Sequence, residues 1–327
     1  MTQRKRVLAM CGGGVRGLYS ITLLSKWERR LAQQTGNDDL NIASYFDLLA
    51  GTSIGGILAL GLASGKNARY LAELLDTHRK DIFPKKKKWA GLPVLRAAKY
   101  DVAPLRNLLE QEFGAKKMGD LSSRCIVPAV NISTGKPLMF KTGHLAEYVR
   151  DPLIDVCDVA LATSAAPTYF PPHRCKSPDL NAYMCDGGLV ANSPALIAFH
   201  EAVHKLGWQQ ESIHVLGIDA LNAPSTIDHG SIGKAGYWKL WGMGERLIDI
   251  TMSSNSAMQD FMLQQIIGDR FTRMATTIPM QQASRITLDN AEDIAAEAMI
   301  AHAENTAANE YRNVEHLFDA PAAPFSQ

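Results

Sequence analysis

The chain has 327 residues, of which 46% are hydrophobic, and it carries a formal net charge of +1. A chain of this length and composition can bury one sizeable core, and it contains no stretch of the roughly eighteen uncharged apolar residues that a membrane-spanning helix needs. The near-zero net charge excludes long-range attraction of the whole molecule to nucleic acid or to an anionic membrane.

Strand and helix patterns alternate along the chain. Short apolar runs predict strands at residues 6–10, 46–50 and 125–132, around Tyr183, and at 213–218. Helical periodicity predicts helices at 18–31, 54–63 and 68–82, from Asp101 and Pro104 onward, and at 153–162 and 194–206. This alternation predicts an α/β fold with a mainly parallel sheet between helices, in a single domain over residues 1–327.

A glycine cluster follows the first predicted strand. Gly12, Gly13 and Gly14 are followed by Arg16 and Gly17, where the first helix is expected to begin. Backbone N–H groups that no side chain covers can converge there on negative charge. That charge is either a phosphate or the oxyanion that forms when a serine attacks an ester.

The same cluster also matches the dinucleotide-binding pattern G-x-G-x-x-G. That interpretation requires an acidic residue about twenty positions further on, at the end of a second strand. Asp38 and Asp39 stand near that distance, but they follow a polar loop with no strand before them. Dinucleotide binding is therefore disfavoured.

A second glycine-flanked turn follows the strand at 46–50. Ser53 stands in Gly51-Thr52-Ser53-Ile54-Gly55, between that strand and the helix at 54–63. This is the context of a nucleophile elbow, in which the glycines permit a tight turn and leave the hydroxyl uncovered. Ser53 is therefore a candidate nucleophile, and an ordinary glycine-rich helix cap is the alternative.

A serine nucleophile needs a base. No histidine after Ser53 stands in an evident loop beside a glycine at the end of a strand. Asp186 is the better candidate, because it ends an apolar segment and is followed by Gly187 and Gly188, where backbone or ligand can approach closely. A simple aspartate-glycine turn is the alternative.

The glycine cluster, the elbow and the Asp-Gly-Gly turn, in this order and spacing, resemble the patatin-like phospholipases, which are Ser-Asp dyad hydrolases. The resemblance extends from about residue 6 to about residue 219 and includes the segments 163–172 and 192–194. It implies a three-layer α/β/α fold and an acyl-enzyme mechanism that needs no metal or cofactor. Cys11 departs from the pattern, since many members carry an aspartate there, but the backbone amides do not depend on it.

The resemblance implies a role for each matched residue. Ser53 is the expected nucleophile and Asp186 the expected general base, whose burial against Ser53 would raise its pKa toward the useful range. The amides of Gly12, Gly13 and Gly14 are the expected oxyanion hole. The supporting positions are Arg16, Gly17, Gly51, Gly55, Gly187 and Gly188.

Within the family, the chain looks most like the CapV-type phospholipases, bacterial antiphage effectors that a cyclic dinucleotide such as cGAMP activates. This likeness implies a membrane phospholipid substrate. It also implies a pocket in which arginine and aromatic side chains hold two phosphates and two bases, although the sequence does not locate it. A lipid acyl hydrolase without nucleotide control and a non-catalytic ligand sensor are the alternatives, and homo-oligomerisation stays open.

A rival motif lies further along the chain. His200, Glu201 and His204 form a full H-E-x-x-H, in which two histidines on one helical face can bind zinc and the glutamate can polarise water. The longer form of this motif lacks its third ligand, because Gln210 stands where a further histidine belongs. An ordinary amphipathic helix accounts for the same residues, so a zinc metalloprotease is disfavoured.

Two regions lie outside the family pattern. Residues 84–100 contain four consecutive lysines before Trp89 and predict a basic cap on an anionic lipid surface, where each nearby lysine adds about 1 kcal/mol. A solvated loop is the alternative, and nucleic acid is disfavoured because no basic stripe continues beyond this segment. Residues from about 222 to 327 predict a regulatory extension with helices at 247–267 and 291–311 and a hairpin between 271–277 and 285–288.

The cysteine content and the N-terminal residues bear on the compartment. The five cysteines are odd in number and contain no C-x-x-C pair, which predicts reduced thiols. The apolar run at 7–10 is too short for the core of a signal peptide. We therefore expect a cytoplasmic enzyme that contacts the inner surface of the membrane peripherally.

Overall fold

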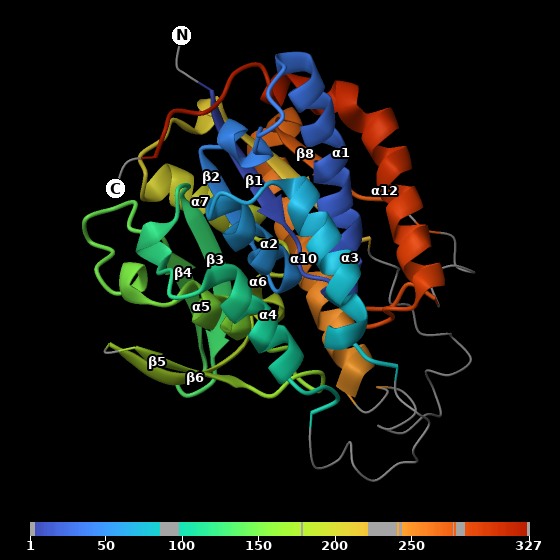
Figure 1. Ribbon diagram of the computed structural model, residues 1–327. Helices are drawn as coiled ribbons and strands as arrows, with labels where there is room; N and C mark the ends of the chain where they lie inside the picture. Colours follow the sequence, from blue (N-terminus) through green and yellow to red (C-terminus); the bar gives the residue numbers. More distant parts are fainter. Residues whose placement is uncertain are drawn as a thin grey trace.

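The computed structural model describes residues 4–85, 98–177, 179–221, 241, 244–276, 278 and 285–325. Within these ranges the strands form one eight-stranded sheet through the middle of the molecule (Figure 1). Their order is β5-β6-β3-β2-β1-β7-β8, and β4 pairs with β3.

The sheet is mixed but mainly parallel, as the sequence predicts. The parallel strands are β1 (Lys5–Met10), β2 (Leu48–Gly51), β3 (Cys125–Asn131), β7 (Ile213–Ile218) and β8 (Phe271–Met274). The antiparallel ones are β4 (Lys136–Lys141), β5 (His173–Ser177) and β6 (Leu180–Asp186).

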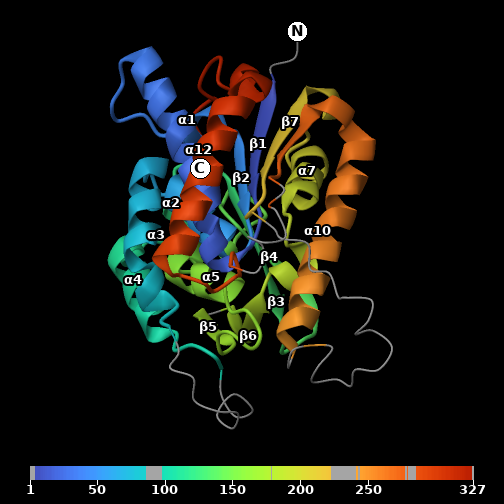
Figure 2. The ribbon, with the colours of Figure 1, turned by 90° about the vertical axis from the view of Figure 1, so that its right-hand side faces the viewer.

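The central strands are apolar on both faces because helices cover both. In β1, Leu8 and Met10 belong to one buried cluster, whereas Val7 and Ala9 belong to another on the opposite face. Figure 2 shows α1 and α12 on one side of the sheet and α7 and α10 on the other. The first cluster includes residues of α1 (Gly17–Thr35), α2 (Ile54–Ala63), α3 (Ala68–Ile82), α4 (Ala103–Phe113), α5 (Val156–Thr163) and α12 (Asp293–Val314), and the second includes residues of α7 (Ala195–His204) and α10 (Glu245–Ile267).

Local signals set the bounds of several helices. The side chain of Asn67 accepts a hydrogen bond of 2.8 Å from the Tyr70 N–H and so caps the start of α3. Helix α1 runs beyond the predicted end at residue 31 and stops at Gly36, whose φ of 68° is the left-handed conformation typical of a helix C-terminus.

Two strands at one side of the sheet are absent from the sequence prediction. Strand β4 contains Pro137 and pairs only with β3 among the described strands, which is the position where a proline is tolerated. In β5, His173 and Cys175 are buried while Arg174 and Lys176 are exposed. Its few apolar residues give little strand signal.

The predicted hairpin between 271–277 and 285–288 is wrong. Strand β8 pairs in parallel with β7, with Phe271 opposite Val215, and residues 285–288 form turns and bends rather than a strand. The sequence indicates a strand at residues 271–277 but does not show which strand it pairs with.

The C-terminal part is joined to the sheet and to α1. Strand β8 extends the sheet beyond β7, and α12 packs along α1. The Trp27 indole N–H donates to the Ala307 carbonyl at 3.1 Å, and its ring centroid is 6.4 Å from that of Tyr311. The predicted helices at 247–267 and 291–311 are confirmed as α10 and α12.

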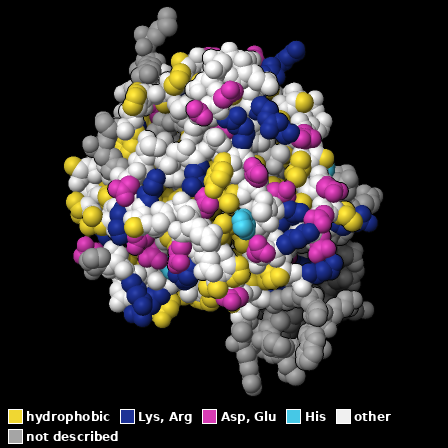
Figure 3. Space-filling view, viewed as in Figure 1, with side chains coloured by type: hydrophobic (Ala, Val, Ile, Leu, Met, Phe, Trp, Pro, Cys, Tyr) yellow, Lys and Arg dark blue, Asp and Glu magenta, His cyan; other side chains and the backbone are white. Residues whose placement is uncertain are grey.

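Most of the basic segment, residues 86–97, and residues 222–240 of the expected extension lie outside the described residues. Lys85 at the edge of the segment pairs with Glu292 at 2.9 Å. Acidic and basic side chains are interspersed on the face shown in Figure 3. No described helix is long and apolar enough to cross a membrane.

Candidate active site

Ser53 occupies a sharp turn between β2 and α2. Its φ of 54° and ψ of −125° are rare for a residue with a side chain and match the strained turn of a nucleophile elbow. A Cβ atom at Gly51 would lie 2.1 Å from the Gly55 carbonyl oxygen, and one at Gly55 would lie 2.3 Å from the Met10 carbonyl oxygen. Both flanking glycines are therefore required by the close approach of backbone.

Asp186 stands at the end of β6 and lies against Ser53. The Ser53 hydroxyl donates to Asp186 Oδ2 at 2.7 Å, and the Gly188 N–H donates to Asp186 Oδ1 at 2.6 Å. Only 1% of Asp186 is exposed. Burial raises the pKa of Asp186 to about 6, although its two hydrogen bonds, from Ser53 and Gly188, act in the opposite direction. The carboxylate is therefore ionised at neutral pH but is a stronger base than an exposed aspartate.

Neighbouring atoms also lie close to the two glycines that follow Asp186. A Cβ atom at Gly187 would lie 2.2 Å from the Pro128 carbonyl oxygen, and one at Gly188 would lie 2.1 Å from the Met252 side chain. The contact at Gly187 is with backbone and excludes a side chain there, whereas the Met252 side chain at Gly188 could move to make room.

The glycine cluster after β1 lies next to Ser53. A Cβ atom at Gly12 would be 3.2 Å from the Ser53 Cβ. The Gly12 N–H donates to the Asn192 carbonyl at 3.1 Å, so it is already engaged. Among the described residues, the amides of Gly13 and Gly14 have no acceptor. Of the three amides that the sequence predicts for the oxyanion hole, these two are available to a ligand.

Two further residues of the cluster support its shape. Arg16 Nε donates to the Gly13 carbonyl at 3.1 Å, which fixes the orientation of that peptide. A Cβ atom at Gly17 would lie 2.4 Å from the Ile54 side chain, so the helix start approaches the elbow closely. Gly14 adopts a left-handed φ of 58°, where its missing side chain also makes room for the Leu288 carbonyl.

Thr163 is a site residue to which the sequence analysis assigned no role. Its hydroxyl accepts from the Ser53 N–H at 3.0 Å and donates to the Pro128 carbonyl at 2.6 Å. Its carbonyl accepts from the Gly187 N–H at 3.2 Å. Thr163 thus connects the elbow, β3 and the turn after Asp186. It belongs to the segment 163–172 that matches the family, but nothing in the sequence shows these contacts.

An apolar cavity of about 40 Å³ lies beside Ser53, and its wall includes Ile54, Ile57, Tyr169 and Leu288. A second cavity of about 50 Å³ lies between α2, α3 and α4 and shares Ile54 and Ile57 with the first. Ser53 itself is only 6% exposed. Ser53 is therefore a wall residue of a small, mainly apolar pocket.

None of the H-E-x-x-H residues lines the pocket at Ser53; the ring centroids of His200 and His204 lie 4.6 Å apart, but Glu201 is not on their side of α7. His200 and His204 are exposed on α7, whereas Glu201 is buried on another side of the helix. Burial would raise the pKa of Glu201, but hydrogen bonds from His144, Lys141 and Tyr148 outweigh it and lower that pKa to about 2. Within the described ranges, no group of three or more histidine, cysteine or acidic side chains is placed to hold a metal ion.

Replacing Glu201 by alanine is expected to lower the free energy of unfolding by about 3 kcal/mol, since it removes the partner of a largely buried ammonium group and an imidazole. Lys141 Nζ lies 2.7 Å and His144 Nε2 lies 3.1 Å from the Glu201 carboxylate. Denaturant unfolding measures the change, and His204→Ala on the exposed side of α7 should stay within about 0.5 kcal/mol of the wild type. A zinc enzyme would instead contain zinc and lose activity in both variants.

Comparison with known proteins gives one consistent result. Residues 8–199 match the family model described as patatin-like phospholipase. The cGAMP-activated phospholipase of Escherichia coli (strain TW11681) is 40% identical, with 99% of this chain and 95% of that protein aligned. The protein of the same name from Vibrio cholerae serotype O1 is 39% identical, with 98% of this chain and 96% of that protein aligned. The one from Pseudomonas aeruginosa is 37% identical, with 89% of this chain and 81% of that protein aligned. The resemblance drawn from the glycine cluster, the elbow and the Asp-Gly-Gly turn is thereby confirmed: the chain belongs to the patatin-like phospholipase family.

Proposed function

We propose that this phospholipase cleaves ester-linked acyl chains from membrane phospholipids with Ser53 as nucleophile and Asp186 as general base, and that cGAMP activates it. The observation that carries the catalytic part is the hydrogen bond of 2.7 Å between the Ser53 hydroxyl and the buried Asp186 carboxylate. A hydroxyl and a base at this distance satisfy the first geometric requirement of nucleophilic catalysis.

The first half of the reaction forms an acyl-enzyme. Asp186 takes the Ser53 proton while the serine oxygen attacks the ester carbonyl carbon. The resulting oxyanion accepts hydrogen bonds from the amides of Gly13 and Gly14. The tetrahedral intermediate then collapses, and the proton held by Asp186 passes to the leaving alcohol, which departs as a lysophospholipid.

The second half returns the enzyme to its starting state. Asp186 takes a proton from water, whose oxygen attacks the acyl-enzyme carbonyl. The second tetrahedral intermediate collapses, the proton passes back to the Ser53 oxygen, and the fatty acid is released. Each step uses only the dyad, the loop amides and water, so the mechanism requires no metal or cofactor.

Two findings support nucleotide control. The three relatives described above bear the name cGAMP-activated phospholipase and align with most of this chain. In addition, the dyad is covered: Leu288 forms part of the cavity wall at Ser53. The adjacent Asp289 accepts from the Tyr100 hydroxyl at 2.7 Å and pairs with Lys99 at 2.8 Å. An activator that separates these groups would uncover Ser53.

This control suits an effector of antiphage defence, in which a phospholipase has to stay inactive until a nucleotide signal appears. The enzyme then acts from the cytoplasm on the inner surface of the membrane. A lipid acyl hydrolase without nucleotide control uses the same dyad and differs only in its response to cGAMP.

Fatty-acid release from phospholipid vesicles, with and without cGAMP, tests the proposed control. We expect cGAMP to raise the rate about 5- to 150-fold, the range of ordinary allosteric coupling. Cyclic di-GMP and cyclic di-AMP serve as matched nucleotides, and Ser53→Ala gives the background. Equal release with and without every nucleotide would leave a phospholipase that cGAMP does not control.

A further inference from the structure

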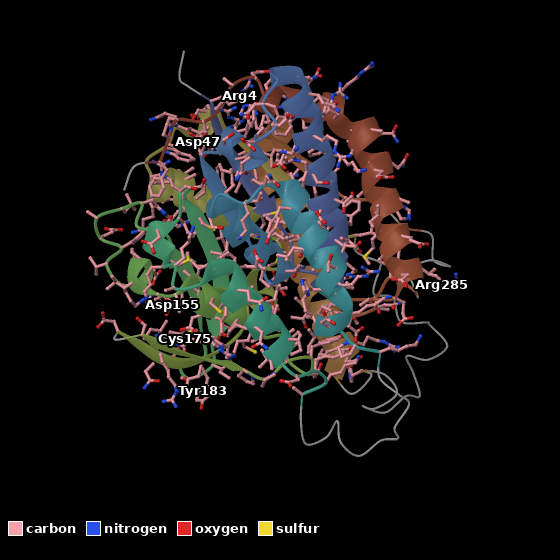
Figure 4. The ribbon with its side chains drawn as sticks, in the orientation of Figure 1. Arg4, Asp47, Asp155, Cys175, Tyr183 and Arg285 are labelled. Atoms are coloured by element: carbon pink, nitrogen blue, oxygen red, sulfur yellow. The ribbon has the colours of Figure 1, made fainter. Side chains whose placement is uncertain are left out.

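A cleft of about 470 Å³ lies next to the cavity at Ser53 and shares Leu105, Ser164 and Phe170 with it. Its walls come from α4, from α5 and the segment after it, and from β5. In Figure 4, Cys175 and Tyr183 of the β5–β6 hairpin and Asp155 at the start of α5 lie on this side of the molecule. The volume falls within the range of about 300–1,000 Å³ that is usual for ligand pockets.

The cleft carries more positive than negative charge. Arg106, Arg174 and Lys176 line it, whereas Asp158 is its one acidic lining residue among those described. Asp158 lies 2.8 Å from His173 Nε2, so that carboxylate already has a partner. Among the residues that the structure describes, no carboxylate forms an ion pair with any of the three cationic side chains.

The contacts of the cationic residues differ from those of most charged groups in this protein. The side chains of Arg106 and Lys176 make no ion pair or hydrogen bond with any described residue. Within the described part of the chain, Arg174 Nε donates only to the neutral Asn181 side chain at 3.2 Å, and the guanidinium lies 5.7 Å from the centroid of the Tyr183 ring. Guanidinium groups in this state are ready to bind an anion, because their planar forks match phosphate oxygens.

One wall of the cleft belongs to the segment that is hydrogen-bonded to Ser53 and Asp186. Ser164 and Ala165 line the cleft, and the Ala165 carbonyl accepts from the Asp186 N–H at 3.0 Å. The neighbouring Thr163 hydroxyl accepts from the Ser53 N–H at 3.0 Å. A ligand in the cleft therefore touches the peptide segment that orients both Ser53 and Asp186.

The hairpin gives a second connection. Strand β5 carries Arg174 and Lys176 at the cleft, and it pairs with β6, which ends at Asp186. In this pairing Arg174 stands opposite Tyr183. The pairing thus connects the cationic residues of the cleft directly to the strand that carries Asp186.

We infer that this cleft binds a phosphodiester, held by Arg106, Arg174 and Lys176 beside the apolar surface of Phe170. The inference rests on the proposed function and deepens it, since a phosphodiester is the group that a glycerophospholipid and a cyclic dinucleotide share. A phospholipid would place its phosphate here while its ester lies at Ser53. A cyclic dinucleotide would place its phosphates on the same cations and act on the dyad through residues 163–165.

Binding measurements on the Ser53→Ala protein test the inference without turnover. Titration calorimetry would use three probes: cGAMP, dihexanoyl phosphatidylglycerol, and the uncharged dihexanoylglycerol. Arg106→Glu and Arg174→Glu are expected to raise the Kd of at least one phosphodiester probe by about 10-fold or more, the loss of one charge-assisted hydrogen bond. The two phosphodiester probes distinguish the possible ligands. If the cleft binds the lipid headgroup, the variants lose affinity for the phosphatidylglycerol; if it binds the activator, they lose affinity for cGAMP.

Controls separate a lost phosphate contact from general damage. Arg29→Glu, on the exposed surface of α1, should leave all three Kd values unchanged. Arg106→Lys keeps the charge and should recover part of the affinity, and thermal melting checks that each variant is folded. Unchanged Kd values for both phosphodiesters in folded Arg106→Glu and Arg174→Glu would overturn the inference, and so would an equal loss for dihexanoylglycerol. Since binding is read without hydrolysis, failure of the catalytic proposal would show separately in the vesicle assay.

Discussion

Replacing Ser53 by alanine is expected to lower kcat for fatty-acid release from phospholipid vesicles by about 10⁴-fold or more, because the variant lacks the proposed nucleophile. The Ser53 hydroxyl is the donor that lies 2.7 Å from Asp186, and Ser53 lines a small apolar pocket. The measurement is the initial rate at a cGAMP concentration that saturates the wild type. Since one oxygen atom is removed and the backbone is kept, binding of lipid and nucleotide should change little.

Ser53→Gly provides a matched variant that separates activity from stability. It removes the same hydroxyl, and glycine tolerates the φ of 54° that strains a residue with a side chain. We expect it to be as inactive as Ser53→Ala but to unfold with a free energy about 1 kcal/mol higher. Fatty-acid release by either variant within tenfold of the wild-type rate would overturn the role of Ser53.

Much of the fold was predictable because its central strands are buried on both faces. Strands β1, β2, β3 and β7 read as short apolar runs, and α2 and α3 lie at the predicted residues. Strand β5 was not predictable, because its sequence His-Arg-Cys-Lys-Ser contains almost no apolar residues. Its buried positions are occupied by His173 and Cys175, which alternate with the exposed Arg174 and Lys176. Its place in the sheet depends on pairing with β6, which is a property of the folded chain.

The candidate site shows the same division. Ser53 and Asp186 were predictable as candidates because a glycine-flanked turn and an Asp-Gly-Gly sequence can each be recognised locally. The two residues are nevertheless 133 positions apart in the chain. The engagement of the Gly12 amide by Asn192 and the bridging role of Thr163 depend on which segments meet in space. Such contacts leave no periodicity or spacing in the sequence.

Replacing Asp186 by asparagine is expected to lower kcat by about 10³-fold, since the amide can still accept a hydrogen bond from Ser53 but cannot take its proton. The wild-type pH profile should reveal the same group. Asp186 acts in its ionised form, and burial raises its pKa to about 6. The kcat/KM of the wild type should therefore be half-maximal near pH 6, fall about tenfold for each pH unit below it, and level off above pH 7.

The stability of Asp186→Asn decides whether the loss of activity is chemical. A carboxylate whose pKa rises from 3.8 to about 6 on folding stabilises the protein only while it is protonated. That contribution is complete below pH 4 and is lost as the pH rises through 6, where the buried charge costs about 3 kcal/mol. Asparagine stays neutral, so the variant should be at least as stable as the wild type at pH 7.5, with a difference that shrinks toward pH 4. A variant that unfolds more easily than the wild type at pH 7.5, or a wild-type rate that stays constant down to pH 4.5, would contradict the assignment of Asp186 as a desolvated general base.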